Sequence, residues 1–362
     1  MASSCPPDLI IDILLYLPGK SLCRFKCVSK SWSILITHPR FVKLHLARNQ
    51  RGKFLLFNVK SLCHLDPETS LLQQEPTSSY RNFRFWPSIS WVSVSSNGLF
   101  CTQMFSPPDD DFYIYNPSTR EYKKILYMES EKESNSRMFF NLHGFGYVES
   151  MDDYKFVKVD IQTRIIQIFS LRNNSWKTIK CDFPFNHINC FANGLRQWKY
   201  GIPLNGAIHW VVYYYDGGHN FPRIVAFDLV KEKFKTFPQH DKVFPKLSQL
   251  TVLRDCLCII NSDDKFWIME KYGTKESWTK IALPNKCSWK DSEFLFGNLD
   301  DDGWLKSDDN HTGFVGNKWY YYKPVFIGKE QYYNKRVYIE NLVSLNFHTN
   351  NAVANEGINN FT

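Results

Sequence analysis

The residues of this chain that could do chemistry are few and widely separated. The nearest approach to a metal site is an acidic stretch in which Asn298, Asp300, Asp302 and Asp309 occupy positions of a calcium-binding loop. The last position of such a loop is normally a bidentate Glu, and helices normally flank it, whereas here it is Asp309 in strand-like surroundings. We interpret residues 298–309 as a solvated acidic loop and predict no metal site.

Nucleophilic and acid–base residues are equally dispersed. None of the ten His residues has a nucleophile or second ligand beside it, and no P-loop, GxSxG, HExxH or GxGxxG motif occurs. His143 and His209 stand in apolar runs, as histidines that pack in sheets do. Cys23 and Cys27 are four residues apart but lack a second pair of zinc ligands. We therefore predict a non-catalytic protein without a cofactor.

Length and composition indicate a globular protein of one large domain or two to three ordinary ones. The chain has 362 residues, of which 43% are hydrophobic and 22% charged. Its longest apolar run, Leu9–Leu17, is too short to span a bilayer, so no membrane association is expected. The chain has ten cysteines but no CxxC pair and no signal peptide. We therefore predict reduced thiols in a protein of the cytoplasm or the nucleus.

Positive charge is concentrated near the N-terminus. Residues 1–50 contain seven Lys and Arg against two Asp, so +5 of the formal net charge of +8 lies there. Such a basic face favours an acidic partner. No basic run, RNP-like strand or recognition-helix pattern occurs, so nucleic acid is not expected as a partner.

Residues 1–48 are predicted to form a bundle of short helices. The first helix carries a broad apolar stripe that ends at Pro18-Gly19. Each helix is too short to be stable alone in water. The first also has more large apolar side chains than so small a bundle can cover, so the excess must pack on the rest of the chain or on a second protein.

Residues 53–348 are predicted to be all-β. The segments "FYIYNPSTREYKKI", "IQIFSLRNNSWKTI", "IVAFDLVKEKFKTF" and "KFWIMEKYGTKESWTKI" each indicate a strand, a polar turn, an aromatic residue and a second strand. The closing aromatics Tyr122, Trp176, Phe234 and Trp278 recur at about four strands per unit. About six such units predict a β-propeller, with a β-sandwich as the alternative.

Two further expectations concern the ends of this β domain. Residues 53–57 are expected to lie beside "VYIENLVSLN" (337–346) and thereby close the ring. The polar, Asn-rich tail, residues 349–362, is expected to be disordered.

The N-terminal segment "PPDLIIDILLYLPGKSLCRFKCVSKSWSILITHPRFVKLHL" resembles the F-box motif of plant F-box proteins. Cys5, where Leu is usual, and Gly19, where Val or Ala is common, depart from the pattern and are expected to affect the strength of the interface. The resemblance implies that the bundle binds the Skp-type adaptor of a cullin-based ubiquitin ligase. The implied contact residues are Pro6, Leu9, Ile10, Ile13, Leu14, Leu17, Pro18, Leu22, Phe25, Val28, Ser29 and Trp32.

The β domain resembles the F-box-associated domain of plants. The matching segments include "SSNGLFC", "YNPSTREYKKI", "LNGAIHWVV", "IVAFDL" and "VYIENLVSL", and within the class they are most similar to the S-locus F-box and S-locus-like group. Defence- and stress-related members share these motifs. The resemblance implies a substrate-recognition subunit that presents a protein substrate for ubiquitination, with a pistil ribonuclease of self-incompatibility as one candidate.

Exposed aromatic and Arg side chains between predicted strands are the residues most suited to contacting a substrate. These candidates are Arg81, Arg84, Trp86, Arg196, Trp198, Tyr215 and Trp289. One alternative is a sensor in which the β domain binds a glycan or small molecule. A propeller enzyme would need carboxylates or a metal cluster converging in one pocket, and the sequence shows neither.

Overall fold

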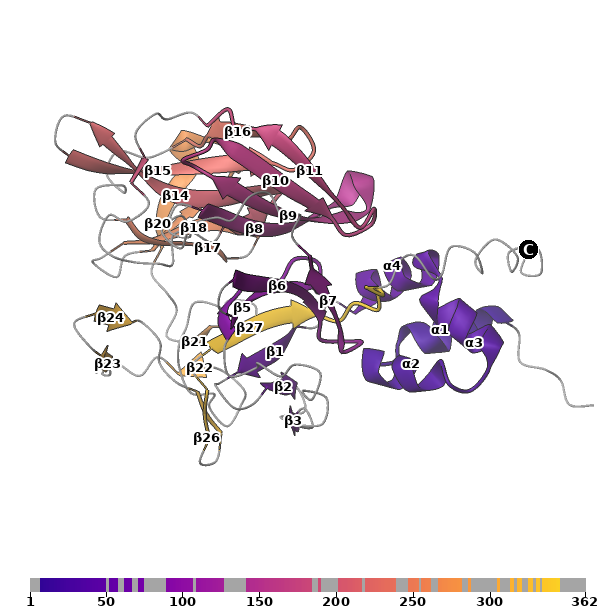
Figure 1. The fold of residues 1–362 in the computed structure, drawn as a ribbon. Coiled ribbons are helices and arrows are strands. Elements are labelled where there is room, and N and C mark those ends of the chain that lie inside the picture. Colours follow the sequence, from indigo (N-terminus) through magenta and orange to yellow (C-terminus); the bar gives the residue numbers. More distant parts are fainter. Residues whose placement is uncertain are drawn as a thin grey trace, which may run out of the picture.

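The computed structural model consists of a bundle of four helices beside a larger region of antiparallel sheets (Figure 1). The structure describes residues 7–49, 52–57, 62–66, 71–74, 89–106, 109–126, 141–183, 188–189, 201–216, 219–238, 247–253, 255–261, 266–281, 286–287, 305–306, 313–315, 318–320, 325–327, 330–332 and 334–345. The predicted order, a helical segment followed by an all-β domain, is confirmed.

The helical bundle comprises α1 (Pro7–Leu15), α2 (Gly19–Phe25), α3 (Lys30–Thr37) and α4 (Pro39–Arg48). Ser29 caps α3, because its hydroxyl accepts a hydrogen bond of 3.2 Å from the backbone N–H of Trp32. Pro39 occupies the first turn of α4, where its missing N–H has no cost. The core of the bundle contains Leu14, Leu15, Leu22, Ile36 and Phe41.

Five sheets of four or five strands follow one another in the described part of the chain, as propeller blades do. The first contains β1 (Gly52–Phe57), β2 (Leu62–Asp66), β3 (Leu71–Gln74) and β27 (Asn334–Ile339). The second contains β4 (Ile89–Val92), β5 (Phe100–Ser106), β6 (Asp109–Asn116) and β7 (Glu121–Ile125). The third contains β8 (Asn141–Val148), β9 (Asp153–Asp160), β10 (Ile165–Ser170) and β11 (Ser175–Lys180).

The fourth sheet contains β12 (Ile188–Asn189), β13 (Ile202–Leu204), β14 (Ala207–Asp216), β15 (His219–Asp228) and β16 (Lys233–Thr236). The fifth contains β17 (Leu247–Leu253), β18 (Cys256–Asn261), β19 (Phe266–Met269) and β20 (Trp278–Ile281). Three two-stranded pairs complete the described strands: β21 (Lys286–Cys287) with β22 (Leu305–Lys306), β23 (Gly313–Val315) with β24 (Lys318–Tyr320), and β25 (Val325–Ile327) with β26 (Glu330–Tyr332).

The repeated aromatics of the sequence are cross-strand partners. Tyr122 faces Tyr115 across the β6–β7 hairpin, and Trp176 and Phe234 close the corresponding hairpins of the next two sheets. Trp278 pairs with Met269 in the same way. Cross-strand pairs of this kind stabilise a sheet and fix its register. The repeat that predicted the blades is therefore the last hairpin of the second, third, fourth and fifth sheets.

Strands from the two ends of the β domain pair in the first sheet, a contact here called ring closure. β1 pairs antiparallel with β27 in a register from Gly52–Ile339 to Phe57–Asn334. The predicted pairing of residues 53–57 with the C-terminal segment is thus confirmed, although β27 ends at Ile339. Residues 340–345 leave the sheet, and Glu340 and Leu342 among them contact the helical bundle.

A buried lysine links two blades and yields the first prediction. Lys155 of β9 donates to the carbonyl of Leu229 at 2.7 Å and contacts the Glu232 carboxylate at 3.1 Å. Replacing Lys155 by Met leaves the buried Leu229 carbonyl without this donor, while Glu232 keeps Lys177 as a partner, so we expect the free energy of unfolding to fall by about 1–3 kcal/mol. The shift of the urea unfolding midpoint measures this loss.

Lys177 is the matched control, because it pairs with the same carboxylate while 62% of its side chain is exposed. An exposed ion pair contributes only about 0–1 kcal/mol, so Lys177→Met should be nearly neutral. Equal losses in both variants would contradict the assignment of Lys155 as the link between blades.

His209 yields a prediction on pH, and as expected from the sequence it is a buried strand residue. Its ring lies 3.1 Å from the Ile202 carbonyl and 2.7 Å from the Tyr272 hydroxyl. Burial lowers its pKa from 6.5 to about 4, with the Ile202 hydrogen bond acting in the opposite direction. The unfolded chain therefore binds more protons between these values, so stability is complete above pH 6.5 and declines as the pH falls toward 4.

The expected loss over this window is about 3 kcal/mol. His209→Gln keeps polar atoms near both partners but does not titrate, so its urea midpoint should lose that part of the pH dependence. An unchanged pH profile in this variant would show that His209 does not titrate with unfolding.

Candidate partner-binding surfaces

Helix α1 has two apolar faces, and only one is covered. Leu14 and Leu15 point inward and are 1% and 2% exposed. Leu9 and Ile13, one turn apart on the other side, are 52% and 53% exposed. Tyr16, at the next position of this stripe, is 73% exposed. A bundle whose core is already filled thus retains a row of large apolar side chains in water.

The residues expected to bind the adaptor divide by burial. Leu9, Ile13, Pro18, Val28 and Ser29 are exposed, while Ile10, Leu17, Phe25 and Trp32 are half-buried. Leu14 and Leu22 are almost completely buried in the core of the bundle. Pro6 lies outside the described residues.

A second apolar position lies at the connection between α2 and α3. Val28 is 64% exposed there, next to the exposed cap residue Ser29. Beneath it, the rings of Phe25 and Trp32 meet edge to face with centroids 5.4 Å apart. This contact fixes the orientation of Trp32 and leaves part of its ring accessible.

Tyr16 and Arg48 extend the α1 stripe and were not among the predicted contact residues. The Arg48 guanidinium lies over the Tyr16 ring, 5.0 Å from its centroid, and 3.4 Å from the Asp12 carboxylate. Arg and Tyr are frequent hot-spot residues of interfaces. The spacing from Leu9 to Ile13 to Tyr16 was a usable signal for the tyrosine, whereas the approach of Arg48 depends on how α4 packs on α1.

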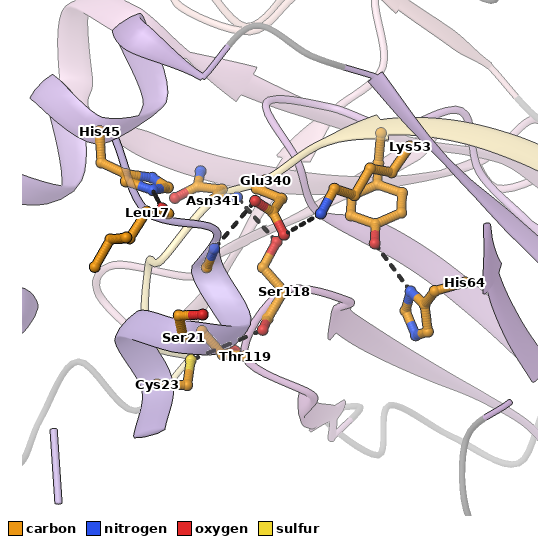
Figure 2. A network of polar contacts seen from close by, with 12 residues as sticks. Leu17, Ser21, Cys23, His45, Lys53, His64, Ser118, Thr119, Glu340 and Asn341 are labelled. Carbon is orange, nitrogen blue, oxygen red and sulfur yellow. Dashed lines mark hydrogen bonds and ion pairs between the residues drawn. The ribbon is translucent and has the colours of Figure 1, made fainter. Parts of the chain in front are cut away.

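The segment Glu340–Leu345, here called the clasp, joins the bundle to the β domain (Figure 2). The Glu340 carboxylate accepts a hydrogen bond of 3.1 Å from the backbone N–H of Gly19 and pairs with Lys53 at 2.8 Å. Leu342 is 1% exposed and belongs to the core of the bundle. Gly19 is buried, and Leu342 and Glu340 of the clasp are its neighbours.

The opposite side of the clasp is held by the β domain. Asn116 donates from its amide to the carbonyl of Asn341 at 2.9 Å, and Asn341 donates to the carbonyl of Asn97 at 2.7 Å. Gly98 allows this close approach, because a Cβ there would lie 2.6 Å from the Asn341 Cβ. Leu345 is fully buried in the core between the second and third sheets.

A second contact between the two parts lies at the turn before β9. Lys43 of α4 pairs with Asp152 at 3.0 Å, and the Tyr147 hydroxyl donates to the same carboxylate at 2.7 Å. Partial burial would raise the pKa of Asp152, but the hydrogen bond from Tyr147 and the charge of Lys43 together lower it. The carboxylate thus stays ionised and fixes α4 against this turn.

Of the seven predicted substrate residues, only Tyr215 falls in a described range. Arg81, Arg84, Trp86, Arg196, Trp198 and Trp289 lie outside the described residues. Tyr215 lies in β14, next to the end of the strand, but its side chain is not described.

Strand directions nevertheless separate two edges of the β domain. The bundle and the clasp contact the turns β4–β5, β6–β7 and β8–β9, through Asn97, Ser118 and Asp152. Successive strands run antiparallel. The end of β3, the start of β4 and the end of β14 therefore lie at the edge away from the bundle.

The described residues offer no group of three or more His, Cys, Asp or Glu side chains that could hold a metal ion. Of residues 298–309, only Leu305 and Lys306 are described, as β22. The helices in the described ranges are all too short or too polar to cross a membrane.

Comparison with known proteins agrees with this architecture. Residues 3–44 match the F-box domain, and residues 43–303 match the F-box associated beta propeller domain. The chain is 30% identical to the F-box protein CPR1 of Arabidopsis thaliana over 78% of this chain and 74% of that protein. It is 26% identical to the F-box/kelch-repeat protein At3g23880 of the same plant, over 76% of this chain and 78% of that protein. The chain therefore belongs to the plant F-box proteins in which an F-box is followed by an F-box-associated β-propeller domain.

Proposed function

We propose that this protein is the substrate-recognition subunit of a Skp–cullin–F-box ubiquitin ligase. Its F-box, the helical bundle, binds the Skp-type adaptor and through it the cullin, while the β domain binds a protein substrate. The protein performs no group transfer itself. It raises the effective concentration of substrate lysines near the ubiquitin-charged enzyme, which is catalysis by proximity.

The observation that carries this proposal is the uncovered apolar stripe of α1. Leu9, Ile13 and Tyr16 stay exposed although the other face of the same helix is buried. Aliphatic and aromatic side chains grouped in this way form the centre of many protein interfaces. Exposed Lys20, Arg24 and Lys30 give the bundle the positive charge that would steer an acidic adaptor toward it.

The substrate surface is placed at the edge of the β domain away from the F-box. Tyr215 stands near a strand end at that edge, where β3 also ends and β4 begins, and in the sequence Arg81, Arg84 and Trp86 come between these two strands. This arrangement leaves the adaptor and the substrate on separate sides of the protein. Arg196, Trp198 and Trp289 complete the proposed contact set.

A pistil ribonuclease is the substrate favoured by the motifs shared with the S-locus group. Cross-linking mass spectrometry with the full chain in pollen and pistil extract, and separately in leaf extract, tests this. Cross-links from the β domain to a ribonuclease support the self-incompatibility role. Cross-links only to leaf proteins would overturn it in favour of a defence or stress role.

The adaptor interface is tested by placing a charge in the α1 stripe. Ile13→Glu puts a carboxylate into the apolar contact, and we expect adaptor binding to weaken by about 2 kcal/mol or more, roughly thirtyfold. Isothermal titration of the full chain with purified Skp-type adaptor measures the change.

Val230→Glu is the matched control. Val230 is 52% exposed, close to the 53% of Ile13, but it lies in the β domain. It should bind the adaptor as the wild type does. Wild-type affinity in Ile13→Glu would exclude α1 from the interface and remove the main support for the proposed function.

A further inference from the structure

We infer that Leu342 and Glu340 are positioning residues of the adaptor-binding surface, so that adaptor affinity depends on the C-terminal clasp. This inference rests on the proposed function. The clasp lies outside the residues that match the F-box and outside those that match the β-propeller description. Glu340 is 321 positions away from Gly19, its partner in the F-box.

The first reason is that Leu342 completes the hydrophobic core of the F-box. It is 1% exposed and packs in one cluster with Leu14, Leu22, Ile36 and Phe41. Leu14 directly follows Ile13, whose side chain points to solvent on the opposite face of α1. The inward face of α1 thus packs in one core with Leu342. This packing sets the direction in which the exposed stripe on the other face points.

The second reason is the polar contact at the start of α2. The Glu340 carboxylate accepts from the backbone N–H of Gly19, the first residue of this helix, and pairs with Lys53 of β1. Glu340 is only 7% exposed. A buried carboxylate without such partners would be strongly unfavourable. Its position is thus fixed jointly by the F-box and the β domain.

The third reason is that the clasp cannot move with the F-box alone. Asn341 and Leu345, on either side of Leu342 in sequence, are both buried in the β domain. The Leu345 backbone N–H also donates to the Glu121 carboxylate at 2.7 Å. The clasp therefore places Leu342 in the F-box core only when its flanking residues are seated between the sheets.

Chain connectivity then couples ring closure to the burial of Leu342 in the F-box core, so that the two occur together. β1 begins at Gly52, shortly after α4 ends at Arg48, and it pairs with β27, which leads directly into the clasp. When β1 is not paired with β27, the strand register that positions Leu342 and Glu340 against the F-box is missing. The F-box would then occupy the adaptor-competent arrangement less often, and the apparent affinity falls in proportion to that fraction.

The same linkage works in both directions. If closure of the ring favours adaptor binding, then adaptor binding must favour closure by the same factor. Adaptor added to the full chain should therefore slow hydrogen exchange in β1 and β27, outside the interface itself.

The test compares two Leu-to-Ala variants of the full chain. Leu342→Ala removes the side chain that completes the F-box core, and Leu257→Ala removes a fully buried side chain of the fifth sheet. In isothermal titration with purified Skp-type adaptor, we expect Leu342→Ala to bind about tenfold more weakly and Leu257→Ala to bind as the wild type does. Equal affinities in all three proteins would overturn the inference.

Hydrogen exchange of the free proteins keeps the test separate from the proposed function. Without adaptor, Leu342→Ala should speed exchange in α1 and α2 more than Leu257→Ala does. Glu340→Gln, which removes the ion pair with Lys53, should do so to a smaller extent. Unchanged exchange in these helices would also overturn the inference, whereas a wild-type protein that does not bind the adaptor would overturn the proposed function instead.

Discussion

The burial of Leu342 in the core of the N-terminal helices is the contact on which the arrangement of this protein depends. Four helices of seven to ten residues enclose little apolar volume, and isolated helices of this length are unstable in water. A bundle near the lower size limit for an independent core gains much from one additional buried leucine. Because that leucine comes from the other end of the chain, the F-box and the β domain are stabilised together.

The polar partners of the clasp add direction to this apolar contact. Leu342 alone could slide or rotate, since hydrophobic burial is not directional. The carboxylate of Glu340 and the amide of Asn341 each bind groups with defined geometry on the two sides of the junction. Few other positions of the segment would satisfy both. The ion pair of Lys43 with Asp152 is partly exposed and screened by salt, so it adds less.

Local patterns in the sequence predicted the helices and strands well. They predicted long-range contacts only where a pattern repeats. The stripe of α1 and the alternation of the hairpins gave the correct helices and strands, and the recurring aromatics gave the pairs closed by Tyr122, Trp176, Phe234 and Trp278. Apolar periodicity does not say which neighbour covers a side chain. The resemblance to the F-box motif implies Leu14 and Leu22 as contact residues together with Leu9 and does not include Tyr16, whereas in the structure the first two are buried and Tyr16 is exposed.

The clasp itself could not be found from sequence, because the segment "ENLVSL" has neither helical nor strand periodicity and its hydrogen-bond partners are 187 or more positions away. Its consequence is geometric. Tethering accelerates a reaction only if the linked sites can be reached at the same time, and a flexible joint spreads the substrate over many orientations. Here Leu342 and Glu340 on one side and Asn341 and Leu345 on the other hold the F-box against the β domain. A substrate at the opposite edge would consequently face the ubiquitin-charged enzyme in a restricted set of orientations. The choice of target lysine would then depend on the rigid arrangement of the F-box and the β domain as well as on the surface that binds the substrate.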